Sequence, residues 1–170
     1  GASAHETVAR TVAAKSCAAI KGRVDAVPGE GALFLRSYDA ANGAGEPPEP
    51  ALATAAFVYD EALATIALIG CGALPEAVRI GEALRIAATT EARLRNVHRA
   101  GPVEAKAQAN GWWDAPRQRW LEDAYQAGTA TGNVAWAALA LLALHDATRE
   151  AKWLDAARGL GRWIVANESD

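Results

Sequence analysis

Apolar residues recur at helical spacing in five runs along this chain. The pattern predicts helices over 4–20, 54–69 and 75–88, a fourth from the cap Asn133 to Leu144, and a fifth with the apolar residues Trp153, Leu154, Ala157, Leu160, Trp163 and Ile164. Ser3 followed by Glu6 is a capping-box pattern, and Pro75 suits the first turn of the third helix. The fourth run is apolar around much of its circumference, which predicts a central helix. Because alanine is abundant and β-branched residues are sparse, we predict an all-α fold of antiparallel helical hairpins.

Two long connections separate these runs. Residues 23–53 are too rich in proline and glycine for a helix, and only 33–35 has an extended pattern. Residues 100–132 lack helical periodicity but hold Trp112, Trp113, Trp120 and Tyr125. Such aromatic density is rare in disordered segments, so this connection is predicted to be folded. Residues 90–99 either continue the third helix or form a short separate one.

The two helical hairpins resemble each other in sequence. Residues 62–68 superpose on 138–144, and after a three-residue insertion the second helix of each hairpin aligns as well, with Ala77, Arg79 and Leu84 opposite Ala156, Arg158 and Trp163. The period is about 76 to 79 residues, and each unit is one long loop plus one hairpin. This repeat predicts a circular or solenoid stack of hairpins.

Composition and charge exclude some classes of function. The chain has 170 residues, of which 51% are hydrophobic and 22% charged, with a net charge of −3, so we expect a single domain over 1–170. Its basic residues are scattered, which argues against a nucleic-acid partner. The longest apolar runs, such as 134–144, are too short to span a membrane. The sequence contains no methionine, so Gly1 is interpreted as a processing scar, and an export signal to the periplasm or the extracellular space can have preceded it.

Cysteine and histidine spacing gives no metal site. Cys17 and Cys71 are interpreted as two buried free thiols, with one disulfide in an exported protein as the alternative. His5, His98 and His145 have no ligand spacing, and no glycine-rich loop has the pattern of a phosphate-binding loop, so we expect no metal and no cofactor. His98 is either an acid or base in a lyase-like site or a solvated histidine at a helix end.

Three short motifs give a resemblance to a known superfamily. They are Ser37-Tyr38-Asp39, Phe57-Val58-Tyr59-Asp60-Glu61-Ala62-Leu63 and Thr131-Gly132-Asn133-Val134-Ala135-Trp136, the last followed by an Ala-Leu-rich run. In these motifs residues 33–166 resemble the six-hairpin glycosidase superfamily, whose (α/α)6 toroids stack six helical hairpins and carry active sites in the loops at one rim. The resemblance implies a carbohydrate-active protein that cleaves or binds an oligosaccharide or polysaccharide through rim loops 33–60 and 101–133.

The predicted helices amount to about half of such a ring. The resemblance therefore implies an incomplete (α/α) toroid, either a part of a larger toroid or a short relative that completes its packing by self-association. Helices at the ends of an open ring would expose apolar flanks, and monomers seldom tolerate apolar patches beyond about a few hundred Å². We therefore expect a homodimer.

Glycosidic hydrolysis requires one carboxyl group that protonates the leaving oxygen and a second that activates water or attacks the sugar. The candidates are Asp60 and Glu61 near the start of the second helix and Asp39 on the preceding loop. The resemblance favours Asp60, in its Tyr-Asp setting, as catalytic, and Asp39 is the next choice. Weaker candidates lie in the later connection: Asp114, Glu122 and Asp123. An acid in the first turns of a helix is also stabilised by the helix dipole, so Asp60 can equally be structural.

Aromatic side chains supply the candidate sugar-binding surface. Trp112 and Trp113 are consecutive, so in an extended segment one ring can offer its flat face to a sugar, although packing under a long loop explains them equally well. Tyr38 and Tyr59 can present hydroxyls to substrate or lie half-buried. Two other functions stay open: a non-catalytic helical module that binds glycan or protein, and structural assembly through exposed helix faces.

Overall fold

The computed structural model describes residues 3–38 and 49–168, and the statements below refer to these residues. The chain is mostly helical. In chain order its elements are α1 (Ala4–Asp25), β1 (Leu33–Phe34), β2 (Ala55–Phe57), α2 (Val58–Gly70), α3 (Leu74–Thr90), β3 (Val97–Arg99), β4 (Gly101–Pro102), β5 (Trp112–Asp114), β6 (Arg119–Leu121), α4 (Ala124–Ala127), α5 (Thr131–Thr148) and α6 (Ala151–Ala166). None of the helices in this part of the chain is long and apolar enough to cross a membrane.

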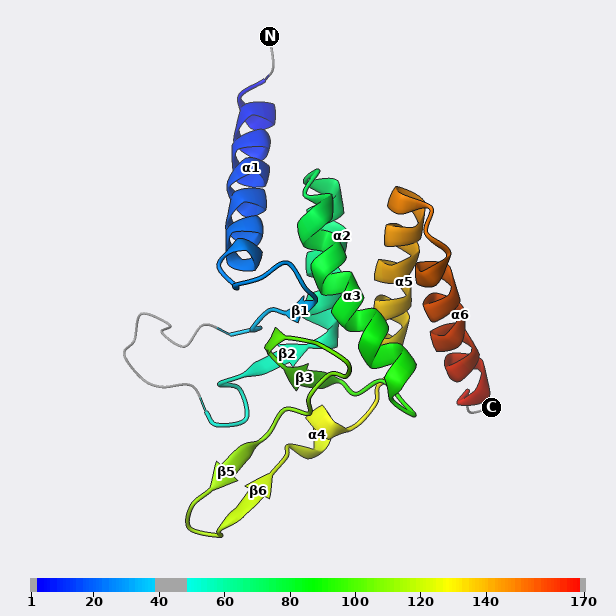
Figure 1. The fold of residues 1–170 in the computed structure, drawn as a ribbon. Coiled ribbons are helices and arrows are strands. Elements are labelled where there is room, and N and C mark those ends of the chain that lie inside the picture. The colour runs from blue at the N-terminus through cyan, green and yellow to red at the C-terminus, as the bar shows by residue number, and fades with distance from the viewer. Residues whose placement is uncertain (1–2, 39–48, 169–170) are drawn as a thin grey trace.

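Two antiparallel hairpins, α2–α3 and α5–α6, lie side by side (Figure 1). Helix α5 packs against α2, α3 and α6, which confirms the prediction of a central helix. Gly81 on α3 allows part of this packing, because a Cβ at Gly81 would overlap the buried side chain of Leu144 on α5. The core between the hairpins includes Leu68, Ile80, Leu84, Leu141, Leu144 and Trp153.

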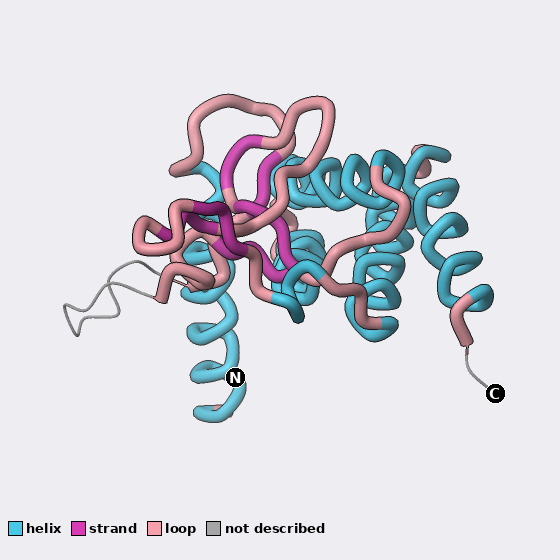
Figure 2. The backbone as a smooth tube through the Cα atoms, turned by 90° about the horizontal axis from the view of Figure 1, so that it is seen from below, coloured by secondary structure: helices cyan, strands magenta, loops and turns pink. Residues whose placement is uncertain are grey.

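The six strands form three two-stranded antiparallel pairs. In the structure the first connection is the segment between α1 and α2, and the second is the segment between α3 and α5. Two of the strand pairs join these connections: Leu33 in β1 lies opposite Pro102 in β4, and Ala55 in β2 lies opposite Arg99 in β3. The strands lie at the end of the hairpins where α2 and α5 begin and α3 ends (Figures 1 and 2). We call this the strand-bearing end. The two connections are therefore brought together along one edge of the molecule.

Pairing between the connections corrects two sequence predictions. The helix predicted over 54–69 begins only at Val58, because 55–57 form β2. Both alternatives for 90–99 are wrong, since α3 ends at Thr90 and 97–99 form β3. In each case a partner distant in the sequence decides the backbone conformation. The extended pattern at 33–35 is confirmed by β1.

Helix termini agree with the sequence in two cases and differ in two. The Ser3 hydroxyl accepts a hydrogen bond from the Glu6 backbone N–H at 3.3 Å, and Pro75 lies in the first turn of α3, both as predicted. The first helix continues past Gly22 to Asp25. Asn133 is not the cap of α5, which begins two residues earlier, at Thr131, with Ala130 as its N-cap residue.

Helix α1 has little apolar contact with the rest of the molecule. Val24 is its one buried residue among those described, whereas Val8 and Val12 are exposed. A disulfide joins Cys17 on α1 to Cys71 at the end of α2, with a Cα–Cα distance of 5.6 Å. The interpretation of both cysteines as free thiols is therefore wrong. The disulfide holds α1 beside the first hairpin in place of a packed face.

Polar contacts fasten the C-terminal end of α1 to α3. Arg79 on α3 donates hydrogen bonds to the carbonyl oxygens of Val24, Val27 and Gly31, at 2.9 to 3.3 Å. Lys21 forms ion pairs with Asp25 at 2.6 Å and with Glu76 on α3 at 2.8 Å. These contacts lie at the last turn of α1 and the loop after it. The disulfide therefore anchors the helix further toward its N-terminus than any of them.

We expect the double substitution Cys17→Ser and Cys71→Ser to lower the free energy of unfolding by about 2–4 kcal/mol, because the disulfide restricts the unfolded chain between residues 54 positions apart. Urea denaturation under non-reducing conditions measures this loss. Limited proteolysis should at the same time cut within α1, because little else buries it. Equal stability and equal protease resistance of the two proteins would contradict this role.

Candidate functional site

The strand-bearing end collects the predicted site residues that the structure describes. Tyr38 follows β1, Tyr59 and Asp60 lie in the first turn of α2, and Trp112 and Trp113 lie in β5. Asp39 lies outside the described residues. The first and second connections therefore both contribute candidates to the same end of the molecule.

Exposed aromatic and exposed aliphatic side chains lie on different parts of the molecule. Among the described residues the large exposed aliphatic side chains all belong to α1, α5 and α6: Val8, Val12, Leu139, Leu142 and Val165. The large exposed aromatic side chains all belong to the two connections and the first turn of α2: Tyr38, Tyr59, Trp113, Trp120 and Tyr125. The strand-bearing end is thus an aromatic surface, and the helix flanks are aliphatic.

Trp120 is a member of this surface that sequence reasoning did not assign to the site. It lies in β6 directly opposite Trp113 in β5. Trp112, by contrast, is partly buried and lies opposite Leu121. The signal that could have identified Trp120 is the Ala-Pro-Arg-Gln turn after Asp114, because a hairpin through this turn pairs the two tryptophans.

The two tyrosines rest against other aromatic rings and stay partly exposed. Tyr59 meets Trp136 edge to face, with ring centroids 5.6 Å apart, which joins the first turn of α2 to α5. Tyr38 meets Phe57 in the same way at 5.9 Å. Edge-to-face contacts fix the orientation of both rings while leaving part of each available to a ligand.

Asp60 and the residue after it, Glu61, line a hollow of about 170 Å³ between α1, α2 and the segment after β1. The other lining residues are Ile20, Arg23, Leu35, Arg36, Ser37 and Ala64. Asp60 is exposed to solvent, whereas Glu61 is only 1% exposed. Successive residues of a helix point about 100° apart, which explains how neighbours reach such different surroundings.

Burial raises the pKa of Glu61 well above its usual value. The backbone N–H of Leu35, which donates to Glu61 Oε2 at 3.1 Å, opposes this shift in part, and the nearby charge of Asp60 adds to it. Sequence reasoning counted Glu61 among the candidate carboxyl groups but favoured Asp60 over it. The sequence pattern that could have predicted the burial of Glu61 is the helical spacing Val58, Glu61, Thr65, Leu68, which places this acid on the buried stripe of α2.

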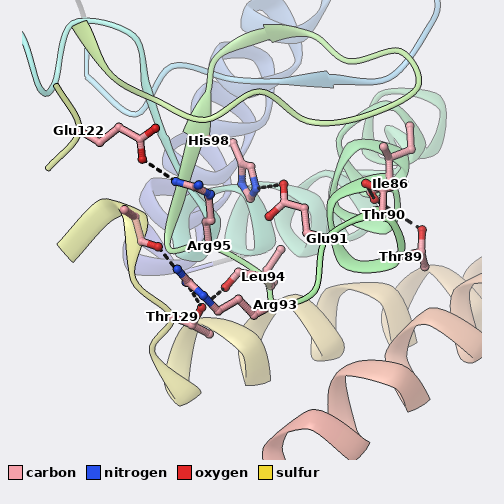
Figure 3. A network of polar contacts seen from close by, with 11 residues as sticks. Ile86, Thr89, Thr90, Glu91, Arg93, Leu94, Arg95, His98, Glu122 and Thr129 are labelled. Carbon is pink, nitrogen blue, oxygen red and sulfur yellow. Dashed lines mark hydrogen bonds and ion pairs between the residues drawn. The ribbon is translucent and has the colours of Figure 1, made fainter. Parts of the chain in front are cut away.

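Each of the weaker acid candidates has a structural partner. Asp114 accepts hydrogen bonds from the backbone N–H and the guanidinium of Arg117, and these lower the pKa of Asp114. Glu122 pairs with Arg95 at 2.7 Å (Figure 3). Asp123 caps α4 by accepting from the backbone N–H of Gln126. These carboxyl groups are explained without a substrate.

His98 is neither solvated nor at a helix end, so that interpretation is wrong. It lies in β3, is fully buried and stacks on Phe34, and its Nε2 lies 3.0 Å from Glu91 Oε1 (Figure 3). A side chain this deep cannot reach a substrate on the surface. We therefore assign it to the interior that supports the strand-bearing end.

Other polar side chains are buried beneath the same end. Asn110 donates hydrogen bonds to the carbonyl oxygen of Ala51 and to Gln126 Oε1, and Gln126 donates to the same carbonyl. The Thr54 hydroxyl donates to Asn110 Oδ1 at 2.8 Å. These contacts join the two connections a second time, through side chains. In the described part of the chain no group of histidine, cysteine and acidic side chains could hold a metal ion.

Comparison with protein-family models, with curated proteins and with solved structures found no match to this chain.

The substitution Glu61→Gln tests the raised pKa of Glu61 through the pH dependence of the free energy of unfolding. A carboxyl group whose pKa is higher in the folded state than in the unfolded state keeps its proton longer when folded, so its contribution to stability falls as pH rises above the unfolded value of about 4.3. We expect wild-type stability to fall between pH 5 and pH 8 relative to that of Glu61→Gln. Urea denaturation across this range measures the difference.

Asp60→Asn on the same helical turn is the matched control. We expect it to retain most of the pH dependence of the wild type, because burial, the largest cause of the raised pKa of Glu61, is unchanged and only the smaller effect of the Asp60 charge is lost. If wild type and Glu61→Gln show the same pH profile, the pKa of Glu61 is not raised by burial.

Proposed function

We propose that this chain is a carbohydrate-active helical domain that binds a glycan across the aromatic surface of its strand-bearing end. The observation that carries the proposal is the concentration of large exposed aromatic side chains at this end, apart from the exposed aliphatic ones. Sugar rings present flat C–H faces that pack on aromatic rings, and their hydroxyl groups require polar neighbours. An aromatic surface framed by charged residues suits both requirements.

The proposal extends to cleavage through Asp60. Asp60 would supply the exposed carboxylate, and Glu61, whose pKa is raised, would supply the protonated carboxyl group that glycosidic hydrolysis needs. Both line one hollow. At about 170 Å³ this hollow is small beside the roughly 300–1,000 Å³ of most ligand sites, so most of the glycan would lie on the open aromatic surface.

We propose further that the two hairpins correspond to neighbouring hairpins of an (α/α) toroid like that of the six-hairpin glycosidases. In support, α2 packs on α5 and α3 on α6, and the starts of α2 and α5 both lie at the strand-bearing end (Figure 1). In such a ring α2 and α5 would form the inner layer, with the active site at the rim where they begin.

A non-catalytic glycan-binding module is the second candidate. Two observations favour it: Glu61 is almost completely buried, and its Oε2 already accepts a hydrogen bond from the backbone of Leu35. A proton donor must come within hydrogen-bond reach of the leaving oxygen, and this position is hard to reach. The two candidates differ in whether new reducing ends form.

We expect wild-type protein, titrated with a panel of neutral and acidic oligosaccharides, to show tryptophan quenching and to release reducing ends from at least one of them. Asp60→Asn should abolish the release while leaving quenching within about twofold, because it removes the reacting carboxylate without removing an aromatic ring. Asp155→Asn, at an acid on α6, is the control and should leave both readouts unchanged.

The outcomes separate the candidates. Cleavage that survives Asp60→Asn overturns the catalytic assignment. Quenching without cleavage by the wild type supports the non-catalytic module. If no glycan gives either signal, the carbohydrate proposal itself is wrong.

The exposed aliphatic flanks support self-association, and we propose that a second copy of the chain covers them. We expect a homodimer by analytical ultracentrifugation at micromolar concentration. Leu139→Lys should shift the protein toward monomer, because Leu139 lies on the exposed side of α5 and a charge there would be costly to bury. A wild-type protein that sediments as a monomer would disprove the dimer.

A further inference from the structure

The β5–β6 hairpin carries two indole rings on one face. Trp113 and Trp120 are direct partners across the two strands, and they are 61% and 47% exposed. Directly opposed residues of an antiparallel pair have Cβ atoms about 4.5–5.5 Å apart and project to the same side of the ribbon. Figure 1 shows that the hairpin projects away from the helices.

Gly111 determines how the ring of Trp120 lies. A Cβ built at Gly111 would stand 2.6 Å from both Cε2 and Cζ2 of Trp120. The indole therefore lies across the backbone of Gly111, in space that any other residue would fill. Because one side of the ring covers this backbone and nearly half of the residue is exposed, the opposite side of the ring faces solvent.

The turn of the hairpin is held by its own contacts. The backbone N–H of Arg117 donates to Asp114 Oδ1 at 2.8 Å, and its guanidinium donates to Asp114 Oδ2 at 2.7 Å. Gln118 closes the turn with a positive φ of 49° and donates to the carbonyl oxygen of Ala115. Such a turn fixes the strand register that places Trp113 opposite Trp120. A ligand would therefore meet rings that are already in position, which lowers the ordering cost of binding.

The surroundings of the two rings favour a saccharide over a protein partner. Within the described residues, the large exposed aliphatic side chains belong to α1, α5 and α6 and none lies on the hairpin. Protein docking patches usually are contiguous apolar areas of several hundred Å². Here two flat rings stand among exposed polar residues, Arg117, Gln118 and Arg119, which can hydrogen-bond to sugar hydroxyls.

We propose that Trp113 and Trp120 form a platform that binds successive sugar units of an extended glycan, at a subsite on the hairpin separate from the hollow of Asp60 and Glu61. This inference rests on the proposed carbohydrate function and gives it a substrate class: a chain long enough to reach from the hollow to the hairpin. The platform makes affinity depend on chain length, because only a long chain occupies both places. Trp120 is its newly assigned member, and Gly111 is a positioning residue that acts through Trp120.

The test compares disaccharides with hexasaccharides of β-glucan, xylan and mannan by isothermal titration calorimetry. We expect wild type to bind at least one hexasaccharide more tightly than its disaccharide. Trp120→Ala and Gly111→Ala should each weaken hexasaccharide binding about tenfold, since each removes or displaces one ring, and leave disaccharide binding within twofold. Val165→Ala, which trims an exposed apolar side chain on α6, is the matched control and should change neither affinity.

Each outcome has a distinct meaning. If wild type binds a hexasaccharide and Trp120→Ala binds it equally well, the platform is refuted and the proposed function stands. If wild type binds none of these sugars, the platform and the carbohydrate function fall together. If Trp113→Ala and Trp120→Ala change the sedimentation of the protein but not its glycan affinity, the rings form a protein interface, and the platform is refuted. Since Gly111→Ala can also disturb β6 through the Leu121 carbonyl, Trp120→Ala decides the matter.

Discussion

Antiparallel pairing between the two long connections is the constraint on which the strand-bearing end depends. A connection of this length must satisfy its backbone N–H and C=O groups wherever it is buried. Here β1 and β2 of the first connection find their partners in β4 and β3 of the second. Further backbone bonds, from Val103 to Ala32 and from Ala100 to Thr54, extend the same seam. The two connections therefore hold each other in place along this seam, whereas the β5–β6 hairpin of the second connection pairs within itself.

Asn96 connects the paired strands to the helices through hydrogen bonds. Its carbonyl oxygen accepts a hydrogen bond from the backbone N–H of Val58, the first residue of α2. Its side-chain oxygen accepts from the backbone N–H of Ala130 and from the amide of Asn133, at the start of α5. One buried residue therefore holds the N-terminal ends of both helices. The edge-to-face contact between Tyr59 and Trp136 joins the same two helices a second time.

The sequence predicts the helical hairpins well because their signals are local. Helical spacing, the capping pattern at Ser3 and the position of Pro75 each involve residues within about one or two turns, so tertiary structure does not alter them. The strands could not be predicted in the same way. The segments 55–57 (Ala-Ala-Phe) and 97–99 (Val-His-Arg) are each only three residues long, and nothing within either segment selects strand over helix. Their conformation comes from each other, across some 40 positions of the chain.

The candidate site shows the same division between features encoded locally and features that depend on distant partners. Tyr38, Tyr59, Asp60 and Trp113 are recognisable as polar or aromatic residues beside helix starts and turns. Trp120 joins them through the register of β5 and β6, for which the turn after Asp114 is the one local signal. The disulfide is a similar case, because the spacing of Cys17 and Cys71 carries no information about the distance between α1 and the end of α2. Residues defined by their partners lie beyond single-sequence reasoning.

Asp60 and Glu61 illustrate how the fold, and not the residue type, sets the chemistry of a carboxyl group. Both lie in the first turn of α2, where the helix dipole favours the ionised form of either. At Glu61 desolvation opposes ionisation, because the segment after β1 covers that side chain, whereas Asp60 is exposed. The cover exists because β1 pairs with β4 in the second connection. The burial that raises the pKa of Glu61 thus depends on a strand pair on the other side of Leu35.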